Sequence, residues 1–545
     1  MRLTFFTTIL FAGVAALHAA ELKIPVIFGD HMVLQQGREI PVWGSATPGE
    51  KVTITLNGRS SETAANAEGK WRLSLPAMPT SKDPLQMTVK CGLETIRYND
   101  VLLGDAWLCS GQSNMGMRVG ATKRAKEIAA AADHPQIRLF LVERNVAFQP
   151  ASEAPGKWVV CSPESVPGFS AVAYHFGLAL QQSQQVPIGL IGTYVGGSHI
   201  FAWTSRETLA AAPARSTAHK RIMEHDRDMQ TLPERVRKYD EELKPAWDRA
   251  LAERKAKYGT AMEAFKKAAV EARAAGLPAP ARPVVQPMEK HPAPPMGDFS
   301  QASSLYNGMV HPLAPFALKG VIWYQGEANT YPGMDVEYQA DLIAMISNWR
   351  QLWNQHDLPF LVVQLPNLIS DKDTWPVLRE SQRLAAQKTP ACGLVATCDV
   401  GDPADLHPAE KQPIGERLAL LARAMVYQED VIGSGPVIRS ARQDGNGIEL
   451  VFEQTGGGLM TGSISAPAFR GTPSPGQVKG FEVATENRNF LPARAEIKGD
   501  RVFIATTSGA APIRFVRYAW APNPEANLYN KAGLPAIPFE IETSR

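Results

Sequence analysis

A serine in a glycine-bounded turn is the first group in this sequence that could do chemistry. Ser113 lies in GDAWLCSGQSNMGM, directly after a short apolar run that is typical of a buried strand. A serine hydroxyl becomes an effective nucleophile only when a base takes its proton, and the base needs a partner that holds its tautomer. His407 and Asp405, two residues apart in DLHP, can supply both functions from one loop. These three residues predict acyl transfer, provided that the fold brings positions 113 and 407 together.

An ordinary structural interpretation of each residue stays open. The turn lacks the second glycine of a G-x-S-x-G nucleophile elbow, because Met115 stands at that position. A single histidine such as His407 is more often a helix cap or a satisfied core residue than a base. The order of the three residues along the chain decides nothing, because triads are recognised by geometry.

Six apolar runs alternate with helical stretches in the middle of the chain, and they indicate the fold class. The runs cover residues 106–111, 137–142, 187–197, 318–326, 359–367 and 393–401. Strands that are buried on both faces and alternate with helices predict a parallel sheet in a three-layer α/β/α domain. Ligands bind such sheets beyond the carboxyl ends of the strands.

Polar side chains and glycines stand where these runs end. They are Gln112, Ser113, Asn114, Gly196, Gly197, Gln325, Glu327, Gln364, Asn367 and the acidic group Asp399, Asp402 and Asp405 with His407. Each has a structural alternative: two glycines often make a tight turn, and buried Gln and Glu side chains often satisfy loop backbone. Their occurrence at five strand ends favours one functional site.

Composition and hydrophobic pattern divide the rest of the chain into four regions. Residues 1–20 read as a secretory signal peptide, so we expect a soluble protein in the periplasm or outside the cell, without membrane insertion. Short strand-like runs separated by turns predict sandwich-like β-domains at 21–100 and 433–545. The intervening 101–432 forms the α/β/α domain, and its segment 207–297 is predicted as an insertion of charged helices followed by a Pro-rich tether.

Composition excludes several classes of function. A formal charge of +2 with 20% charged residues gives no electrostatic footprint for nucleic acid. The histidines show neither HExxH nor clustered ligand spacing, and Asp399, Asp402 and Asp405, which could hold Ca²⁺, lack EF-hand spacing. We therefore predict no metal and no cofactor. Of five dispersed cysteines at least one must stay unpaired, and Cys392 and Cys398 could pair.

Several long motifs resemble the sialate O-acetylesterase type of carbohydrate esterase in the SGNH hydrolase superfamily. They are GDAWLCSGQSNM, IGTYVGGSHIFAWTS, LYNGMVHPLAPFALKGVIWYQGEAN, PFLVVQLPN with LRESQ, DVGDPADLHPAEKQPIGERLA and VRYAWAPNPEANLYNKAGLPAIPF. The resemblance covers most of the chain in one order. It implies a serine esterase that removes O-acetyl groups from sugars, so the expected partner is an acetylated sugar or glycan; no protein partner is indicated.

The resemblance also assigns roles. It implies Ser113 as nucleophile, His407 as base and Asp405 as its orienting acid. The oxyanion hole would use the backbone N–H groups of Ser113 and Gly197 and the side-chain amide of Gln325. Residues expected to line the sugar pocket are Gln112, Asn114, Arg118, Glu327, Gln364 and Arg379, of which the two arginines could meet a sugar carboxylate.

Two departures from the pattern leave alternatives open. Many superfamily members carry the aspartate three residues before the histidine, where this chain has Ala404, so Asp402 stays an alternative third member. After GQSNM the chain continues with Gly116-Met117-Arg118, which leaves substrate preference open between sialate and acetylated xylan or another polysaccharide. A non-catalytic carbohydrate-binding protein is the alternative of another class. The aromatics Trp203, Trp323, Tyr518 and Trp520 could stack on sugar rings or fill the core.

Overall fold

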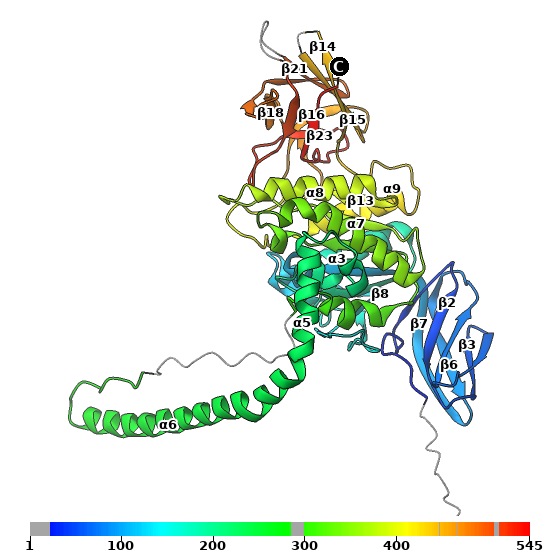
Figure 1. The fold of residues 1–545 in the computed structure, drawn as a ribbon, viewed down its shortest axis with the longest axis vertical. Helices are drawn as coiled ribbons and strands as arrows, with labels where there is room; N and C mark the ends of the chain where they lie inside the picture. Colours follow the sequence, from blue (N-terminus) through cyan, green and yellow to red (C-terminus); the bar gives the residue numbers. More distant parts are fainter. Residues whose placement is uncertain (1–21, 285–298, 446, 466, 506–511, 545) are drawn as a thin grey trace, which may run out of the picture.

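The structure is a computed structural model that describes residues 22–284, 299–445, 447–465, 467–505 and 512–544. The predicted signal peptide and most of the predicted Pro-rich tether lie outside the described residues. Figure 1 shows the central sheet and its helices in the middle, strands β2, β3 and β6 on one side, and strands β14 to β23 on the opposite side.

The N-terminal strands follow the alternating pattern of half-buried β-structure. In β3 and β5 every second side chain is buried, which matches the two-residue period of a strand. Strand β2 pairs with β5, and β3 pairs with β4 and β6. The bounds are β1 Val33–Gln35, β2 Ile40–Ser45, β3 Lys51–Leu56, β4 Arg59–Ala64, β5 Lys70–Leu75 and β6 Ser81–Cys91.

Strand β7, Glu94–Gly111, joins this region to the central sheet as one continuous element of 18 residues. Its first half pairs with β6, and its second half pairs with β10 and β11. The burial pattern changes from alternating to continuous at Val101, where the strand leaves a one-sided sheet for one that is covered on both faces. The strand therefore runs across the expected boundary between residues 100 and 101.

The central sheet has the strand order β13-β12-β11-β7-β10-β8-β9. All neighbours pair in parallel except β9, which lies antiparallel at the edge. The bounds are β8 His134–Leu141, β9 Trp158–Cys161, β10 Ile188–Tyr194, β11 Gly320–Tyr324, β12 Phe360–Val363 and β13 Cys392–Val395. The prediction of a mixed α/β fold with a large parallel sheet is confirmed, and β7 brings Ser113 to the carboxyl edge of a central strand.

Alternate residues of the central strands pack into two separate cores. Trp107 and Cys109 belong to one cluster, which includes residues of α3 (Ala171–Gln184) and α9 (Gln412–Met425). Ala106 and Leu108 belong to the other, which includes residues of α7 (Met334–Trp353) and α8 (Thr374–Lys388). The two helix pairs therefore cover opposite faces of the sheet.

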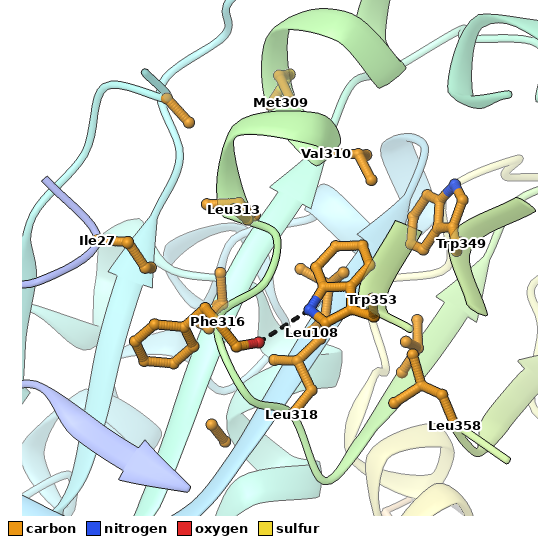
Figure 2. Close-up of a cluster of buried hydrophobic side chains, with 14 of the residues drawn as sticks. Ile27, Leu108, Met309, Val310, Leu313, Phe316, Leu318, Trp349, Trp353 and Leu358 are labelled. Atoms are coloured by element: carbon orange, nitrogen blue, oxygen red, sulfur yellow. Dashed lines mark hydrogen bonds between the residues drawn. The ribbon is translucent and has the colours of Figure 1, made fainter. Parts of the chain in front are cut away.

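Figure 2 shows part of the second core, where three regions meet. Ile27 from the N-terminal region, Leu108 from β7, the segment from Met309 to Leu318 and the α7 tryptophans belong to this one cluster. Trp353 Nε1 donates a hydrogen bond of 2.9 Å to the carbonyl of Phe316. The N-terminal strands thus share a core with the central sheet.

The predicted insertion is helical in the part that the structure describes. It contains α4 Arg206–Ala210, α5 Thr217–Lys238, the π-turn Tyr239–Leu243 and α6 Lys244–Ala274. Helix α5 contacts α7, whereas α6 has no buried residue and projects away from the molecule in Figure 1. The remaining helices of the central region are α1 Ser113–Gly116 and α2 Ala125–Ala130, with a short 3₁₀ turn at Glu327–Asn329.

The C-terminal region is built of short antiparallel strands around its own core, which contains Leu450, Val502, Val516 and Phe539. The strands are β14 Val437–Asp444, β15 Gly447–Glu453, β16 Leu459–Ser463, β17 Thr472–Pro473, β18 Phe481–Ala484, β19 Leu491–Pro492, β20 Ala495–Lys498, β21 Arg501–Ala505, β22 Phe515–Tyr518, β23 Leu528–Asn530 and β24 Phe539–Glu542. Among the described residues, no helix has the length and apolar character needed to cross a bilayer.

The structure also tests the predictions for the cysteines and for four aromatic residues. All five cysteines are unpaired, so the suggested bridge between Cys392 and Cys398 is absent. Trp203, Trp323 and Tyr518 are at most 1% exposed, which makes them core residues and not stacking platforms. Trp520 is half-buried with the Arg517 guanidinium 4.3 Å above its ring.

Candidate active site

The turn that carries Ser113 is fixed by two preceding residues. Gly111 has φ +144°, and a side chain there would place its Cβ 2.1 Å from the carbonyl oxygen of Tyr324, so only glycine fits. The amide of Gln112 donates to the same carbonyl, and its side-chain Oε1 accepts from the N–H groups of Gly326 and Ala328 at 3.3 and 3.2 Å. Ser113 then begins the short helix α1 and is half-buried. The turn is therefore tied to the end of β11.

His407 reaches Ser113 from the loop between β13 and α9. His407 Nε2 lies 2.7 Å from Ser113 Oγ, although the two residues are 294 positions apart in the chain. A neutral imidazole protonated on Nδ1 can accept the hydroxyl proton at Nε2. The fold therefore brings together the two residues that the sequence predicts as nucleophile and base, in a geometry suited to proton transfer.

The electrostatic surroundings favour the neutral form of His407. Burial lowers the pKa of His407 below its ordinary value, the Lys411 ammonium lowers it further, and the Asp405 carboxylate opposes both effects. A base must be unprotonated to accept the serine proton, so these surroundings favour the reactive form at neutral pH.

The carboxylates of the two aspartates accept hydrogen bonds from the loop backbone. Asp405 Oδ1 accepts the backbone N–H of His407 at 2.8 Å, and Asp402 Oδ1 accepts the N–H of Ala404 at 3.0 Å. Within the described residues, neither carboxylate accepts a hydrogen bond from His407 Nδ1. The structure thus differs from the expectation that Asp405, or alternatively Asp402, orients the ring directly.

Replacement of Asp405 by alanine should therefore lower kcat/KM by about 10- to 100-fold, because one hydrogen bond to a charged group is worth roughly 1.5–3 kcal/mol. An aspartate that orients the imidazole typically contributes about 10⁴-fold. Steady-state kinetics on an acetyl ester, with Asp402→Ala as the matched variant, distinguish the two roles. A loss near 10⁴-fold for either variant would show that its carboxylate reaches the ring during turnover.

Two glycines follow β10, and the first of them borders the nucleophile. A Cβ added to Gly196 would lie 3.4 Å from the Ser113 Cβ, whereas one added to Gly197 would face Phe299 at 3.9 Å. Gly197 has φ +74°, which accounts for glycine at that position. Both residues are exposed, and in the described part of the chain neither N–H has a hydrogen-bond acceptor. Free N–H groups beside a nucleophile can stabilise an oxyanion, and Gly196 lies nearer to Ser113 than the predicted Gly197.

Gln325 occupies an internal position that differs from the expected role. Its side chain is fully buried, and Nε2 donates to the carbonyl of Ser198 at 3.0 Å and to Asn329 Oδ1 at 2.8 Å. Tyr338 donates its hydroxyl to Gln325 Oε1 at 2.8 Å. Both amide hydrogens are engaged, so the side chain braces the turn that carries the two glycines and does not point at an oxyanion.

The residues expected in the sugar pocket are mostly interior. Gln112, Asn114, Glu327, Gln364 and Arg379 are 0–7% exposed, whereas Arg118 is exposed. Arg379 donates to the carbonyls of Leu365, Pro366, Ala521 and Pro522, and Gln364 donates to the carbonyl of Arg379. These side chains connect the end of β12 to the C-terminal region. Sequence cannot distinguish such a buried arginine from a ligand-binding one, because both are polar residues next to a strand end.

One site residue is absent from the sequence prediction. Lys411 is 1% exposed, precedes α9 and donates to Asn114 Oδ1 at 2.5 Å. Burial lowers the pKa of Lys411 to about 7, and the nearby carboxylates of Glu327 and Asp405 oppose that shift. A lysine in the polar stretch HPAEKQ resembles any solvated charge, so no sequence signal marks it.

Within the acidic group that lacks EF-hand spacing, Asp399 has protein partners. Arg417 donates to both oxygens of Asp399 at 2.7 Å, and the Tyr529 hydroxyl donates to Oδ2 at 3.0 Å. In the described ranges, no group of three His, Cys, Asp or Glu side chains is arranged to hold a metal ion.

Comparison with known proteins gives matches to carbohydrate esterases that extend over most of the chain. The family described as "Carbohydrate esterase, sialic acid-specific acetylesterase" matches residues 104–231 and 293–424, which contain Ser113 and His407. The gap between these matched ranges contains α6. The sialate O-acetylesterases of Mus musculus and Homo sapiens are each 27% identical to this chain; the mouse alignment covers 94% of this chain and 93% of the mouse protein, and the human alignment covers 91% and 88%.

A solved structure agrees with these matches. A carbohydrate acetylesterase from Xanthomonas citri is 31% identical, with a TM-score of 0.75, and the alignment covers 96% of this chain and 100% of that one. Fold and comparisons together define an ester hydrolase of the carbohydrate acetylesterase class. The chain belongs to the sialic acid-specific acetylesterase family of carbohydrate esterases, which confirms the resemblance found in its motifs.

Proposed function

We propose that this enzyme is a sialate O-acetylesterase that releases acetate through an acyl-enzyme on Ser113. The observation that carries the proposal is the distance of 2.7 Å between Ser113 Oγ and His407 Nε2 at the carboxyl edge of the sheet. Sialate O-acetylesterases are also the curated relatives that align with more than 90% of this chain.

The reaction runs in two halves. Ser113 Oγ forms a bond to the acetyl carbon while its proton passes to His407 Nε2, and the C–O bond to the sugar breaks as the sugar oxygen takes that proton. Water then attacks the acetyl-serine, His407 again accepts and returns the proton, and acetate leaves. The Ser113 N–H and the free N–H groups of Gly196 and Gly197 supply the oxyanion donors, with Gln325 as the brace behind them.

The sugar pocket of the proposal contains Arg118, the exposed member of the two predicted arginines. Its guanidinium can bind the carboxylate of a sialic acid in a bidentate manner, which a neutral xyloside does not offer. Buried Arg379 cannot bind a sugar carboxylate in this way, because its guanidinium donates its hydrogen bonds to backbone carbonyls.

A panel of acetylated sugars tests the proposal. We expect acetate release from O-acetyl sialates to exceed release from acetylated xylo-oligosaccharides in kcat/KM, because only the sialate carries a carboxylate for Arg118. Arg118→Ala should lower kcat/KM on the sialates about 10- to 100-fold and leave neutral esters unchanged, as the loss of one charge-assisted contact of roughly 1.5–3 kcal/mol implies. Preference for the xylosides would assign the enzyme to the polysaccharide acetyl esterases. No Ser113-dependent acetate release from any substrate would favour a non-catalytic carbohydrate-binding protein.

We also propose a domain organisation and a cellular location for the protein. We interpret residues 101–432 as a three-layer, SGNH-like α/β/α domain with an insertion at 207–297, flanked by sandwich-like β-domains at 21–100 and 433–545. The two helix pairs on opposite faces of the sheet support the three layers. The apolar stretch after Arg2 supports export to the periplasm or the extracellular space.

A further inference from the structure

A buried polar cluster lies directly behind the contact between Ser113 and His407. We define it as Asn114, Glu327 and Lys411, whose exposed fractions are 0, 7 and 1%. The three residues come from α1, from the turn after β11 and from the residue that precedes α9. The cluster therefore joins three separate segments at the carboxyl edge of the sheet.

The hydrogen bonds in the cluster fix one orientation of the Asn114 amide. Lys411 Nζ donates to Asn114 Oδ1 at 2.5 Å. Asn114 Nδ2 donates to Glu327 Oε1 at 2.5 Å and to the carbonyl oxygen of Leu406 at 3.0 Å. An ammonium group has donors only and an ionised carboxylate has acceptors only, so the amide cannot turn over without losing both partners while both groups are charged. Burial raises the pKa of Glu327, and the hydrogen bond from Asn114 lowers it.

This orientation connects the neighbours of the two reactive residues. Asn114 follows Ser113 in the chain, and Leu406 precedes His407. The hydrogen bond from Asn114 Nδ2 to the Leu406 carbonyl is a direct side-chain link between the nucleophile turn and the base loop. The base loop has exposed residues at positions 404–406, and across the described residues its Asp402 and Asp405 carboxylates accept hydrogen bonds only from its own backbone. The Ile369 N–H also donates to the Pro403 carbonyl at 2.7 Å, at a greater distance along the chain from His407 than Leu406.

We propose that Lys411 is a positioning residue, which locks Asn114 so that its amide clamps the Leu406 carbonyl and holds the His407 imidazole against Ser113. The inference rests on the proposed serine mechanism and adds a residue to it. Lys411 does not touch the substrate, and it acts through Asn114.

The charge of Lys411 has a second, measurable consequence. Three ionisable groups surround the ammonium: Glu327 and Asp405, which attract it, and His407, whose pKa it lowers. The ring of Tyr324 lies 5.7 Å from Nζ. Removal of the ammonium should raise the pKa of His407, so the acid limb of the kcat/KM profile should move to higher pH. A role in folding alone would leave that limb unchanged.

Lys411→Met tests the proposal, because methionine keeps the length of the side chain but neither donates nor carries charge. We expect kcat on a chromogenic acetate to fall about 10²-fold, as a displacement of reacting groups by about 1 Å can cost, with KM within twofold of the parent. The acid limb should shift upward in pH. Lys388→Met, at the exposed end of α8, is the matched control and should keep both parent values.

Lys411→Met leaves the Glu327 carboxylate buried without its cation, so a loss of activity could come from misfolding. A second variant separates these two causes. Lys411→Met/Glu327→Gln removes both charges, and the new amide still offers an acceptor to Asn114. We expect the double variant to melt cooperatively near the parent temperature and to show the same loss of kcat and the same shift of the acid limb. Parental kcat and an unshifted limb in the folded double variant would overturn the proposal. Activity that survives Ser113→Ala would instead overturn the serine mechanism, so the two failures are distinguishable.

Discussion

Ser113→Ala should lower kcat on acetyl esters by on the order of 10³–10⁶-fold, with the fold intact. The hydroxyl is the atom that forms the acyl bond, and its partner His407 Nε2 lies 2.7 Å away. The loss corresponds to about 4–8 kcal/mol of transition-state stabilisation, which far exceeds the value of one hydrogen bond. Steady-state kinetics, together with a search for an acetylated Ser113 by mass spectrometry under single-turnover conditions, measure it.

The control removes a hydroxyl that has no part in the site. Ser183 is exposed on α3 and donates only to the carbonyl of Leu180, so Ser183→Ala should keep the parental kcat. Retention of more than a tenth of the parental activity by a purified Ser113→Ala protein would eliminate the covalent mechanism. A different nucleophile, such as a directly activated water, would then have to be sought at the same edge of the sheet.

The fold was predictable where burial leaves a local pattern. The apolar runs at 106–111, 318–326 and 359–367 contain or overlap the strands β7, β11 and β12, because a strand covered on both faces must be apolar throughout. The continuity of β7 was not predictable. The change from alternating to continuous burial within Glu94–Gly111 looks like the end of one domain and the start of another, whereas one unbroken strand serves two sheets.

The candidate site was predictable to the level of residues at strand ends, and the orientation of their side chains was not. Parallel topology alone directs Ser113 and the His407 loop to one edge. The partners of a polar side chain depend on contacts between distant segments, such as the bonds from Arg379 to Ala521 and Pro522. Lys411 is the clearest case, since only tertiary packing turns a lysine of a polar stretch into a buried group beside the base.

His407→Gln should also reduce kcat by about 10³-fold or more, and the double variant with Ser113→Ala should lose little beyond the single serine variant. Glutamine fills similar space but cannot accept a proton at neutral pH, so the serine hydroxyl stays weakly nucleophilic. Residues that act as one unit give non-additive losses, whereas independent contributions would multiply. Kinetics of the two single variants and the double variant form the cycle that measures this coupling.

The pH dependence of kcat/KM in the parent enzyme tests the role of His407 independently. A base works when it is neutral, so kcat/KM should rise with pH through the pKa of His407 and level off above it. Burial and the Lys411 ammonium lower that pKa, which places the rise below the ordinary histidine value of about 6.5. The residual activity of His407→Gln should lack this limb. A limb that persists in that variant would assign the titration to another group and leave the 2.7 Å contact with Ser113 Oγ without a catalytic role.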